Sequence, residues 1–573
     1  MSISLLQQER HRYLPKVPDL LRGDFRRVCA RRGLSTTAVA DYDALRSLFA
    51  RTYGQPLVNF VNASEKNEDS PMETAPEPRG LRVAIVLSGG QAPGGHNVIA
   101  GLFDGLKRWH ADSVLIGFLG GPAGVLSGDH IEICADRVDA YRNTGGFDLI
   151  GSGRTKIESE SQFAAAAQTV TRMALDALVV VGGDDSNTNA ALLAEHFVNS
   201  GISTKVIGVP KTIDGDLKNE AIETSFGFDT ATKTYSELIG NIARDACSAR
   251  KYWHFIKLMG RSASHIALEC ALKTQPNVCL ISEEVAAQSL TLAQIVQSLC
   301  DTIATRAQHG EHFGIVLVPE GLIEFIPEMK ALITELNEVM ARRAQEFEAL
   351  DTPDAQRVWI EQALSASARA VFNALPAEIS TQLLADRDPH GNVQVSRIDT
   401  ERLLILQVTE RLAQMKQEGT YTGVFSSIAH FFGYEGRCAF PSNFDADYCY
   451  TLGLTACLLA VHRFTGYVAS VRNLTSSVAE WAVGGVPLTM LMNMERRHGS
   501  QKPVIKKALV DLEGMPFRVF SRRRASWALK TSYVYPGAVQ YYGPPAVCDE
   551  PSVTIRLERP APAANSSFGH RSS

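Results

Sequence analysis

The stretch VVVGGDDSNTNAALLAEHF, Val179–Phe197, is typical of a buried strand, a tight glycine turn and then a helix. Free N–H groups and the helix dipole favour an anion at a helix N-terminus that follows such a turn. This turn nevertheless carries two adjacent carboxylates, Asp184 and Asp185, which would repel a bare phosphate. A divalent cation would reconcile the two features, because Mg²⁺ typically binds one or two carboxylates together with substrate phosphates. Helix N-capping, for which aspartate is favoured, is the alternative interpretation.

Short apolar runs alternate with helical patterns from Leu81 onward. The runs LRVAIVL, ALVVVG and FGIVLVP each precede a glycine turn or a polar loop. Continuous apolar strands that alternate with helices predict an α/β fold with mainly parallel sheets, covered on both faces. Ligands bind such sheets beyond the carboxyl ends of the strands. The loops that follow strands are therefore the candidates for one shared site.

The composition of the 573-residue chain is that of a globular protein, with 45% hydrophobic and 21% charged residues. Its formal net charge of −5 argues against a nucleic-acid or membrane-surface partner, since such binders are usually basic. No apolar run approaches the roughly 18 residues that cross a bilayer, and the N-terminus lacks the apolar core of a signal peptide. The ten cysteines include no CxxC pair, so we expect reduced thiols and a cytoplasmic location.

Changes in composition predict a division of the chain into segments. In chain order these are a helical N-terminal extension with a linker (1–80), an α/β domain (81–245) completed by later residues (about 440–545), a second α/β domain (246–440) with a helical insertion (about 324–419), and a C-terminal tail (546–573). The linker is the polar, proline-bearing stretch Asn62–Gly80. We expect residues 561–573 to be disordered.

Two further loops after predicted strands contain groups suited to phosphate chemistry. SGGQAPGGHN, Ser88–Asn97, has four glycines, which let a backbone approach a ligand closely, although a simple tight turn explains them equally well. GVPKTIDGDLKN, Gly208–Asn219, contains Lys211, Asp214 and Asp216. A lysine can neutralise charge on a transferring phosphoryl group, and an aspartate can accept a hydroxyl proton. A polar loop held by local hydrogen bonds is the alternative.

Three shorter stretches also follow predicted strands. KLMGRSASHIALE places Arg261 where it could bind phosphate in a bidentate manner. VPEGL places Glu320 where a carboxylate could hold sugar hydroxyls, and FFGYEGRCAF places Tyr434 and Arg437 around a glycine turn. Each stretch alone could equally be structural, so its interpretation depends on the whole set.

The ordered set GGDDS, PKTIDGD, MGR, PEG and GYEGR resembles the motifs of pyrophosphate-dependent 6-phosphofructokinases. The similarity extends from about Leu81 to Tyr542 and includes TGYVASVRNLTSSVAEWAVGGVPLTMLM and KPVIKKALVDLEGMPF. The insertion and the N-terminal extension resemble the long subgroup of that family. The resemblance implies two phosphofructokinase-type three-layer domains. It also implies a Mg²⁺-dependent, reversible transfer of a phosphoryl group from pyrophosphate to the 1-hydroxyl of fructose 6-phosphate, a glycolytic reaction.

The resemblance further implies roles for individual residues. Asp184 would hold Mg²⁺, Gly90 and Lys211 would bind pyrophosphate, and Asp214 would accept the proton of the attacking hydroxyl. Lys211, Asp185 and Arg261 would be the other catalytic residues. The residues that would contact the sugar phosphate are Thr212, Ile213, Asp214, Lys251, Tyr252, Met259, Gly260, Arg261, Glu320, Tyr434, Glu435, Gly436 and Arg437. Lys251 and Tyr252 match a pair that in this family reaches into a neighbouring subunit's site, which implies at least a dimer.

Positions 185 and 211 bear on the choice of phosphoryl donor. ATP-using relatives resemble GGDGS and PGTIDND, with glycine where this chain has Asp185 and Lys211. A carboxylate at 185 would occupy and repel the α-phosphate of ATP, while Lys211 would compensate charge on the pyrophosphate leaving group. The chain is therefore expected to use pyrophosphate. An ATP-dependent phosphofructokinase, a non-catalytic regulatory subunit and another kinase with a GGD loop are the alternatives.

Overall fold

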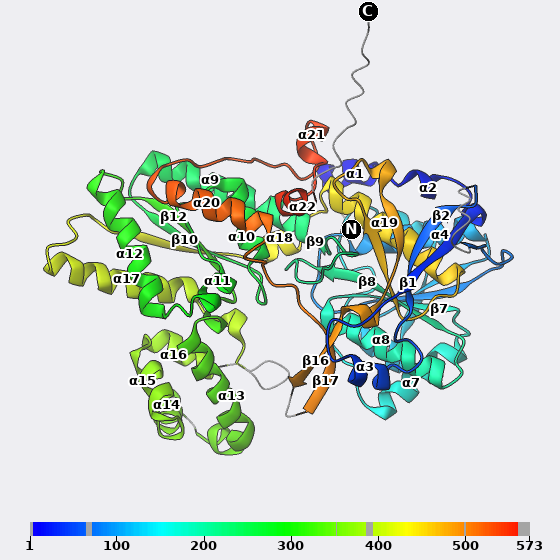
Figure 1. Ribbon diagram of the computed structural model, residues 1–573, viewed down its shortest axis with the longest axis horizontal. Coiled ribbons are helices and arrows are strands. Elements are labelled where there is room, and N and C mark those ends of the chain that lie inside the picture. Colours follow the sequence, from blue (N-terminus) through cyan, green and yellow to red (C-terminus); the bar gives the residue numbers. More distant parts are fainter. Residues whose placement is uncertain (1–3, 65–71, 351, 386–392, 498–499, 560–573) are drawn as a thin grey trace, which may run out of the picture.

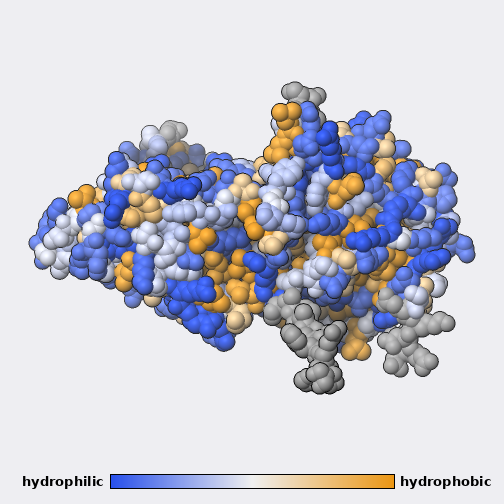
Figure 2. Space-filling model, turned by 90° about the horizontal axis from the view of Figure 1, so that it is seen from above, coloured by the Kyte–Doolittle hydropathy of each residue, from blue (hydrophilic) through white to orange (hydrophobic). Residues whose placement is uncertain are grey.

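The structure is a computed structural model that describes residues 4–64, 72–350, 352–385, 393–497 and 500–559. The predicted disordered stretch 561–573 and part of the predicted linker lie outside these residues. Two α/β lobes lie side by side, and a separate group of helices lies below one of them (Figure 1). The surface seen from above is mostly hydrophilic, with hydrophobic side chains gathered near the junction of the lobes (Figure 2). None of the helices in the described part of the chain is long and apolar enough to span a membrane.

The larger sheet has 11 strands and a parallel centre. In spatial order the parallel strands are β14 (Tyr467–Arg472), β8 (Lys205–Thr212), β7 (Ala177–Gly182), β4 (Arg82–Leu87) and β5 (Val114–Phe118). Their residues are almost all buried, which explains their continuous apolar sequences. The helices that cover the two faces are α4 (Gly95–Trp109) and α19 (Asn443–Val461) on one side, and α7 (Glu160–Arg172) and α8 (Asp184–Asn199) on the other. The predicted α/β class is confirmed.

Helices α4 and α19 approach each other closely through two glycines. A Cβ atom on Gly101 would lie 2.1 Å from the carbonyl oxygen of Tyr450, and one on Gly453 would lie 2.3 Å from that of Val98. Because real Cβ contacts are never so short, only glycine allows this backbone-to-backbone packing. The close packing holds α4, and with it the glycine-rich loop at its N-terminus, against the sheet.

The N-terminal extension is not mainly helical, contrary to the prediction. It contributes β1 (Val28–Ser35), β2 (Pro56–Asn62) and β3 (Met72–Glu73) to the larger sheet, where β2 pairs in antiparallel fashion with β15 (Ala482–Pro487). Its helices are short: α1 (Leu5–His11), α2 (Asp19–Arg22) and α3 (Tyr42–Leu48). In β1 only the first three residues are buried. The strand therefore shows neither a continuous apolar run nor a clean alternation, the two patterns that indicate strands in a sequence.

The smaller sheet consists of four parallel strands. In spatial order they are β11 (Val278–Cys279), β12 (Gly314–Pro319), β10 (Trp253–Leu258) and β13 (Ser427–Phe432). The helices that cover it are α9 (Phe228–Ala249) and α10 (His265–Thr274) on one face, and α12 (Leu292–Gln308) and α17 (Thr400–Gln417) on the other. One contiguous apolar cluster contains both Val179 of β7 and Ile256 of β10, so the two lobes share a core.

The segment from about 324 to 419 consists of helices, as its sequence pattern predicts. In chain order these are α13 (Pro327–Glu348), α14 (Pro353–Ala363), α15 (Ala366–Ala374), α16 (Ala377–Leu384) and α17. The buried Lys257 of β10 attaches α17 to the smaller sheet, because its Nζ lies 3.2 Å from the carboxylate of Glu401 and donates to the carbonyl oxygen of Ile398 at 3.0 Å. The other helices lie apart from the sheets in Figure 1.

Residues 440–545 do not all complete the first domain, contrary to the prediction. The strands β14 and β15 and helix α19 join the larger sheet, whereas α20 (Met515–Leu529) packs against α10 and α12 of the smaller-sheet lobe. Between them lies a hairpin of β16 (Met492–Arg497) and β17 (Ser500–Ile505). The predicted tail begins with two further short helices, α21 (Pro545–Cys548) and α22 (Val553–Glu558), of which α22 packs on α10 and α20. The chain therefore crosses between the lobes more often than its sequence pattern indicates.

Candidate functional site

The candidate loops all follow the carboxyl ends of strands in the two sheets. The loops after β4, β7 and β8 belong to the larger sheet, and those after β10, β12 and β13 belong to the smaller one. Arg437, after β13, joins the two sets, because its Nη1 donates to the carbonyl oxygen of Gln91 at 3.0 Å and its Nε contacts Met259 Sδ at 3.0 Å. The carboxyl ends of the two sheets therefore face one another.

Asp184 and Asp185 occupy the first turn of α8. The N-cap of this helix is Gly183, and no side chain caps it, so N-capping does not explain either aspartate. The Asp184 carboxylate lies 3.5 Å from Lys507 Nζ, and that of Asp185 lies 3.5 Å from Lys156 Nζ. The two adjacent carboxylates therefore face different cations.

Lys211 is buried at the end of β8. Its Nζ donates to the carbonyl oxygen of Gly90 at 2.9 Å, which connects the loops after β8 and β4. Burial, together with the nearby Arg437 guanidinium, lowers the pKa of Lys211 to about 8. Gly89 has a φ of +83°, a left-handed conformation that favours glycine and lets the loop pass beside the lysine.

Asp214 lies in the loop beyond β8, beside Arg437. Its Oδ1 is buried without a hydrogen-bond partner among the described residues and lies 4.0 Å from Arg437 Nη2. The backbone N–H of Asp214 donates to Thr212 Oγ1 at 3.1 Å, which fixes the loop locally. The Ile213 side chain is fully buried in the core, so this residue can offer a ligand only its backbone. An acceptor oxygen without a donor is thus held between the two sheets.

Asp216 is a buried carboxylate near Asp214 and Asp184. Burial, together with the charges of Asp214 and Asp184, raises the pKa of Asp216 to about 7. The carbonyl oxygen of Asp216 accepts a hydrogen bond from the backbone N–H of Ala508 at 2.7 Å. The loop after β8 is therefore attached to the segment that carries Lys507.

Gly260 and Glu320 meet at the carboxyl ends of β10 and β12. The N–H of Gly260 donates to the Glu320 carboxylate at 3.0 Å, and Gly260 has a φ of +128°. Burial raises the pKa of Glu320 to about 7, although the Gly260 hydrogen bond acts in the opposite direction. Arg261 turns to Glu324 instead, with its Nη2 3.4 Å from the Glu324 carboxylate.

The turn Tyr434–Arg437 is a short helix, α18, that follows β13. Gly436 packs on Tyr235 of α9, since a Cβ at this position would lie 2.6 Å from the tyrosine ring. The Glu435 carboxylate accepts the N–H of Gly433 at 2.8 Å, while the Tyr434 side chain is exposed. Glu435 and Gly436 therefore shape the turn, and Arg437 projects toward Asp214.

Lys251 and Tyr252 do not join the other predicted site residues within one chain. They immediately precede β10, whereas Met259 and Gly260 follow it. The six-residue strand therefore separates the two pairs by about 20 Å at ~3.3 Å per residue. The Lys251 ammonium lies over the Tyr252 ring, 5.0 Å from its centroid.

Three cations of the site were missed by sequence reasoning. Lys507 contacts Asp184, Lys156 contacts Asp185, and Arg154 lies beside Gly90 and affects the pKa of Lys211. The stretch GSGRTK could have indicated Arg154 and Lys156 by its glycines and adjacent basic residues. Lys507 follows a hairpin far along the chain, and its neighbour Lys506 is also a lysine, so the sequence does not single it out.

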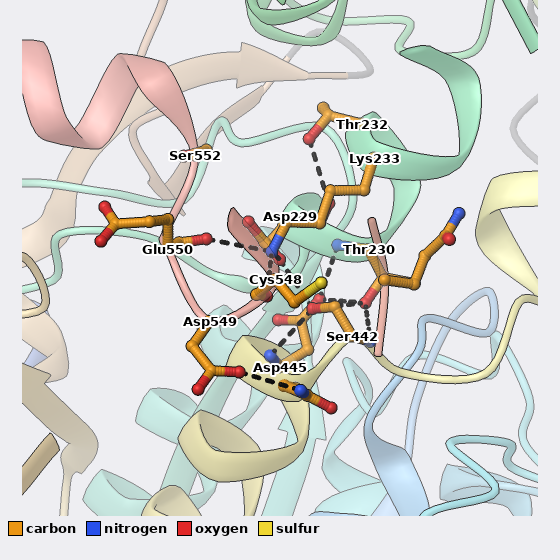
Figure 3. A network of polar contacts seen from close by, with 12 residues as sticks. Asp229, Thr230, Thr232, Lys233, Ser442, Asp445, Cys548, Asp549, Glu550 and Ser552 are labelled. Carbon is orange, nitrogen blue, oxygen red and sulfur yellow. Dashed lines mark hydrogen bonds and ion pairs between the residues drawn. The ribbon is translucent and has the colours of Figure 1, made fainter. Parts of the chain in front are cut away.

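A buried polar network supports the loop after β8 from behind (Figure 3). The Asp445 carboxylate accepts the N–H groups of Gly227 at 3.1 Å and Thr230 at 2.9 Å. Burial, with the nearby Asp229 charge, raises the pKa of Asp445 to about 7. Because the short strand β9 (Phe226–Gly227) pairs with Lys211 and Thr212, the network holds the strand that carries both residues.

Lys233 connects this network to the C-terminal segment. Its Nζ lies 2.8 Å from the Asp229 carboxylate and donates to the carbonyl oxygens of Cys548 at 3.2 Å and Glu550 at 3.0 Å (Figure 3). Ser442 Oγ donates to the same Asp229 carboxylate at 2.6 Å. The described part of the predicted tail is thus bound to the helix that follows the site.

The Asp184 carboxylate fits a Mg²⁺ ion whose other ligands include the phosphate oxygens of a substrate. The described residues contain no group of three or more His, Cys, Asp or Glu side chains that could hold a metal ion. Mg²⁺ does not require such a cage, because it is usually bound by one or two carboxylates plus substrate phosphates. Asp184, at a helix N-terminus near Lys211, would provide the protein side of such a site.

The fold and this arrangement of loops are those of a phosphoryl-transfer protein with two facing α/β lobes. The phosphofructokinase family profile matches residues 82–372, and the chain belongs to this family.

Among its relatives, the pyrophosphate–fructose 6-phosphate 1-phosphotransferase of Porphyromonas gingivalis is 53% identical over 559 residues, covering 98% of this chain and 100% of that protein. The enzyme of the same name from Entamoeba histolytica is also 53% identical, with the same coverage of both chains. The crystal structure of the pyrophosphate-dependent phosphofructokinase of Nitrosospira multiformis matches with a TM-score of 0.52 at 16% identity, covering 79% of this chain and 93% of that chain. This similarity of structure confirms the predicted phosphofructokinase-type fold.

Proposed function

We propose that this protein transfers a phosphoryl group reversibly from pyrophosphate to the 1-hydroxyl of fructose 6-phosphate, giving fructose 1,6-bisphosphate and phosphate. The names of the relatives that are 53% identical over nearly the whole chain support this reaction. The observation that carries the donor assignment is the position of Lys211, whose Nζ lies 2.9 Å from the carbonyl oxygen of Gly90 in the glycine-rich loop. A cation at position 211 compensates the negative charge of pyrophosphate. The corresponding motif of ATP-using relatives resembles PGTIDND, with glycine at this position.

The proposed catalytic residue is Asp214, which accepts the proton of the attacking hydroxyl. Its unpartnered buried Oδ1 supports this role, because a substrate hydroxyl would supply the missing donor. Lys211 stabilises negative charge on the donor and on the leaving phosphate. Phosphoryl transfer requires little covalent chemistry from the protein, so positioning and charge compensation account for most of its contribution.

Asp184 would hold Mg²⁺, which when bound neutralises charge on the phosphate oxygens. Asp185 would keep a longer polyphosphate out, since its carboxylate stands one position further along the same helical turn. In this proposal the two aspartates attract one donor and exclude another.

The sugar phosphate would bind between the two sheets. Glu320 would hold sugar hydroxyls, with the Gly260 N–H supporting its carboxylate. The residues that complete the proposed pocket are Thr212, Ile213, Met259, Arg261, Tyr434, Glu435, Gly436 and Arg437. Arg261 would leave Glu324 to bind the phosphate group, because a bidentate guanidinium–phosphate pair is stronger than the separated 3.4 Å contact with Glu324.

The proposed assembly is a homodimer whose sites are shared between subunits. Lys251 and Tyr252 lie at the end of β10 opposite to Met259, so in this proposal they serve a neighbouring subunit's site. The adjacent strand β13 is at the edge of its sheet, and its residue Phe431 and the preceding Val424 are exposed hydrophobic residues. A partner would cover such an edge. The cytoplasmic location is likewise proposed, and the ten free cysteines are compatible with a reducing compartment.

A coupled assay of the purified protein tests the proposed function. Fructose 1,6-bisphosphate formation is measured with Mg²⁺, fructose 6-phosphate and either pyrophosphate or ATP. We expect turnover with pyrophosphate and a kcat/KM for ATP that is lower by at least about a hundredfold, as expected when a polar group clashes with the wrong ligand. Equal use of ATP would identify an ATP-dependent enzyme, and inactivity with both donors would indicate a regulatory subunit.

A further inference from the structure

We propose that Lys507 binds pyrophosphate directly and thereby completes the donor site from the segment that follows β17. This inference rests on the proposed function. Lys507 contacts Asp184 in the first turn of α8, whereas Lys156 contacts the adjacent Asp185.

The Lys507 ammonium is already located at the proposed metal-binding carboxylate. Its Nζ lies 3.5 Å from Asp184 Oδ2 and donates to Ser262 Oγ at 2.6 Å. Asp184 belongs to the larger-sheet lobe, whereas Ser262 follows β10 of the smaller sheet. Lys507 therefore lies between the donor side and the acceptor side of the site.

The backbone on both sides of Lys507 is fixed to the site. The N–H of Ile505 donates to Thr188 Oγ1 of α8 at 3.1 Å, and the N–H of Ala508 donates to the carbonyl oxygen of Asp216 at 2.7 Å. The carbonyl oxygen of Ala508 also contacts His265 Nε2 at 2.8 Å. A surface lysine does not require three such anchors, but a ligand-binding lysine benefits from them because its position is preorganised.

The charges around the ammonium explain why a cation is needed there. The carboxylates of Asp184, Asp216, Asp214 and Asp185 all act on Lys507. Pyrophosphate would add several further negative charges among them, and Lys211 is a second lysine that lies near Asp184 and Asp214. When a phosphate group binds beside Asp184 through a divalent cation, the Lys507 ammonium can donate to its oxygens, because a lysine has three donors on a flexible chain.

The test compares Lys507→Gln with its neighbour Lys506→Gln, a matched control. Lys506 is exposed, and its backbone N–H bonds to the carbonyl oxygen of Leu491, away from the site. Binding of magnesium pyrophosphate is measured by calorimetry on full-length protein without sugar phosphate, and binding of fructose 6-phosphate is measured separately. We expect Lys507→Gln to weaken pyrophosphate binding about ten- to a hundredfold, the range for a lost charged hydrogen bond, and fructose 6-phosphate binding to remain within about twofold. Lys506→Gln should bind both like the wild type.

Three outcomes would overturn the inference. Pyrophosphate binding by Lys507→Gln could match that of the wild type, fructose 6-phosphate binding could fall in parallel, or Ser262→Ala could reproduce the whole loss. The last two would mean that Lys507 merely orders the loop after β10. If the wild type itself does not bind magnesium pyrophosphate, the proposed function fails instead.

A measurement on the wild type covers the case in which the variant does not fold. Lysine acetylation is followed by mass spectrometry with and without magnesium pyrophosphate. We expect the ligand to slow acetylation of Lys507 and to leave Lys506 unchanged. Equal acetylation rates at Lys507 under both conditions would also overturn the inference.

Discussion

The Nζ of Lys211 and the carbonyl oxygen of Gly90 lie 2.9 Å apart and join the loops after β8 and β4. The lysine is buried, and its positive charge lies beside the glycine-rich loop rather than in solvent. Such a charge is stabilising only when an anion accompanies it, since a buried unpaired charge is costly. An anionic ligand bound at the glycine-rich loop would therefore compensate the buried charge of Lys211.

Donor selection is the first prediction. The double variant Asp185→Gly, Lys211→Gly should lower kcat/KM for pyrophosphate by at least about a hundredfold, because a charge-compensating group is lost, and should give measurable activity with ATP. The control Lys156→Gln removes the cation next to Asp185 but leaves the carboxylate in place. Full pyrophosphate activity in the double variant would show that these positions do not select the donor.

Proton acceptance by Asp214 is the second prediction. Asp214→Asn should reduce kcat by about 100- to 10,000-fold, the usual contribution of a general base, while both substrates still bind. Calorimetry and steady-state kinetics measure the two effects. Asp216→Asn removes a neighbouring carboxylate of the same loop and should cost much less. Comparable losses in both variants would assign the effect to local charge.

The pH dependence of pyrophosphate binding is the third prediction. Because the pKa of Lys211 is lowered to about 8, its side chain is a cation below that pH and neutral above it. Affinity should therefore fall as the pH rises through about 8, as measured by calorimetry. In Lys211→Arg the fall should disappear, since arginine remains charged. An unchanged pH profile in that variant would point to another group.

The same lowered pKa affects folding stability. The unfolded lysine titrates near 10.5, so the contribution of Lys211 to the free energy of unfolding becomes more favourable as the pH rises from about 8 to that value.

Sharing of sites between subunits is the fourth prediction. Lys251→Ala and Asp214→Asn should each be nearly inactive alone. A hybrid dimer, isolated with two different affinity tags, would contain one intact site, made of Asp214 from one subunit and Lys251 from the other. We expect about half of the wild-type activity, as the two-fold symmetry requires. An inactive hybrid would mean that Lys251 serves its own chain.

Stability of the buried network is the fifth prediction. Lys233→Met leaves the Asp229 carboxylate buried without its cation and should lower the free energy of unfolding by about 3–5 kcal/mol, as measured by urea denaturation. The double variant Lys233→Met, Asp229→Asn should recover part of the loss, because it removes the uncompensated charge. Unchanged stability of Lys233→Met would contradict this role of the ion pair.

The sequence predicted the strands whose local hydrophobic pattern matches their burial in the folded protein, and the loops that follow those strands. The strands that lead to Asp184, Lys211 and Glu320 are buried on both faces, so their apolar runs identify them and place these residues at the carboxyl ends of the two sheets. The strand β1 was missed because it lies toward one side of the sheet and half of its residues are exposed.

The cations of the site were harder to predict for a different reason. Lys507 reaches Asp184 only through the three-dimensional path of the chain, which the hairpin and the hydrogen bond between Ala508 and Asp216 determine. Nothing in the local pattern of a lysine reports such long-range contacts. The hydrophobic pattern of a strand indicates which of its faces are buried, but the partner of a flexible charged side chain depends on the assembled fold.

The position of β15 has a consequence for how the protein is made. The strands β1 and β2 leave the ribosome early, but the neighbour that attaches β2 to the larger sheet is β15, near the other end of the chain. At about 10 residues per second the wait is roughly 40 s, during which a small antiparallel unit must persist without its neighbour. The exposed edge of that unit is then open to pairing with other nascent chains. The nascent chain is therefore prone to mispairing in a way that the folded structure does not show. We expect its dependence on chaperones to be greatest during this interval.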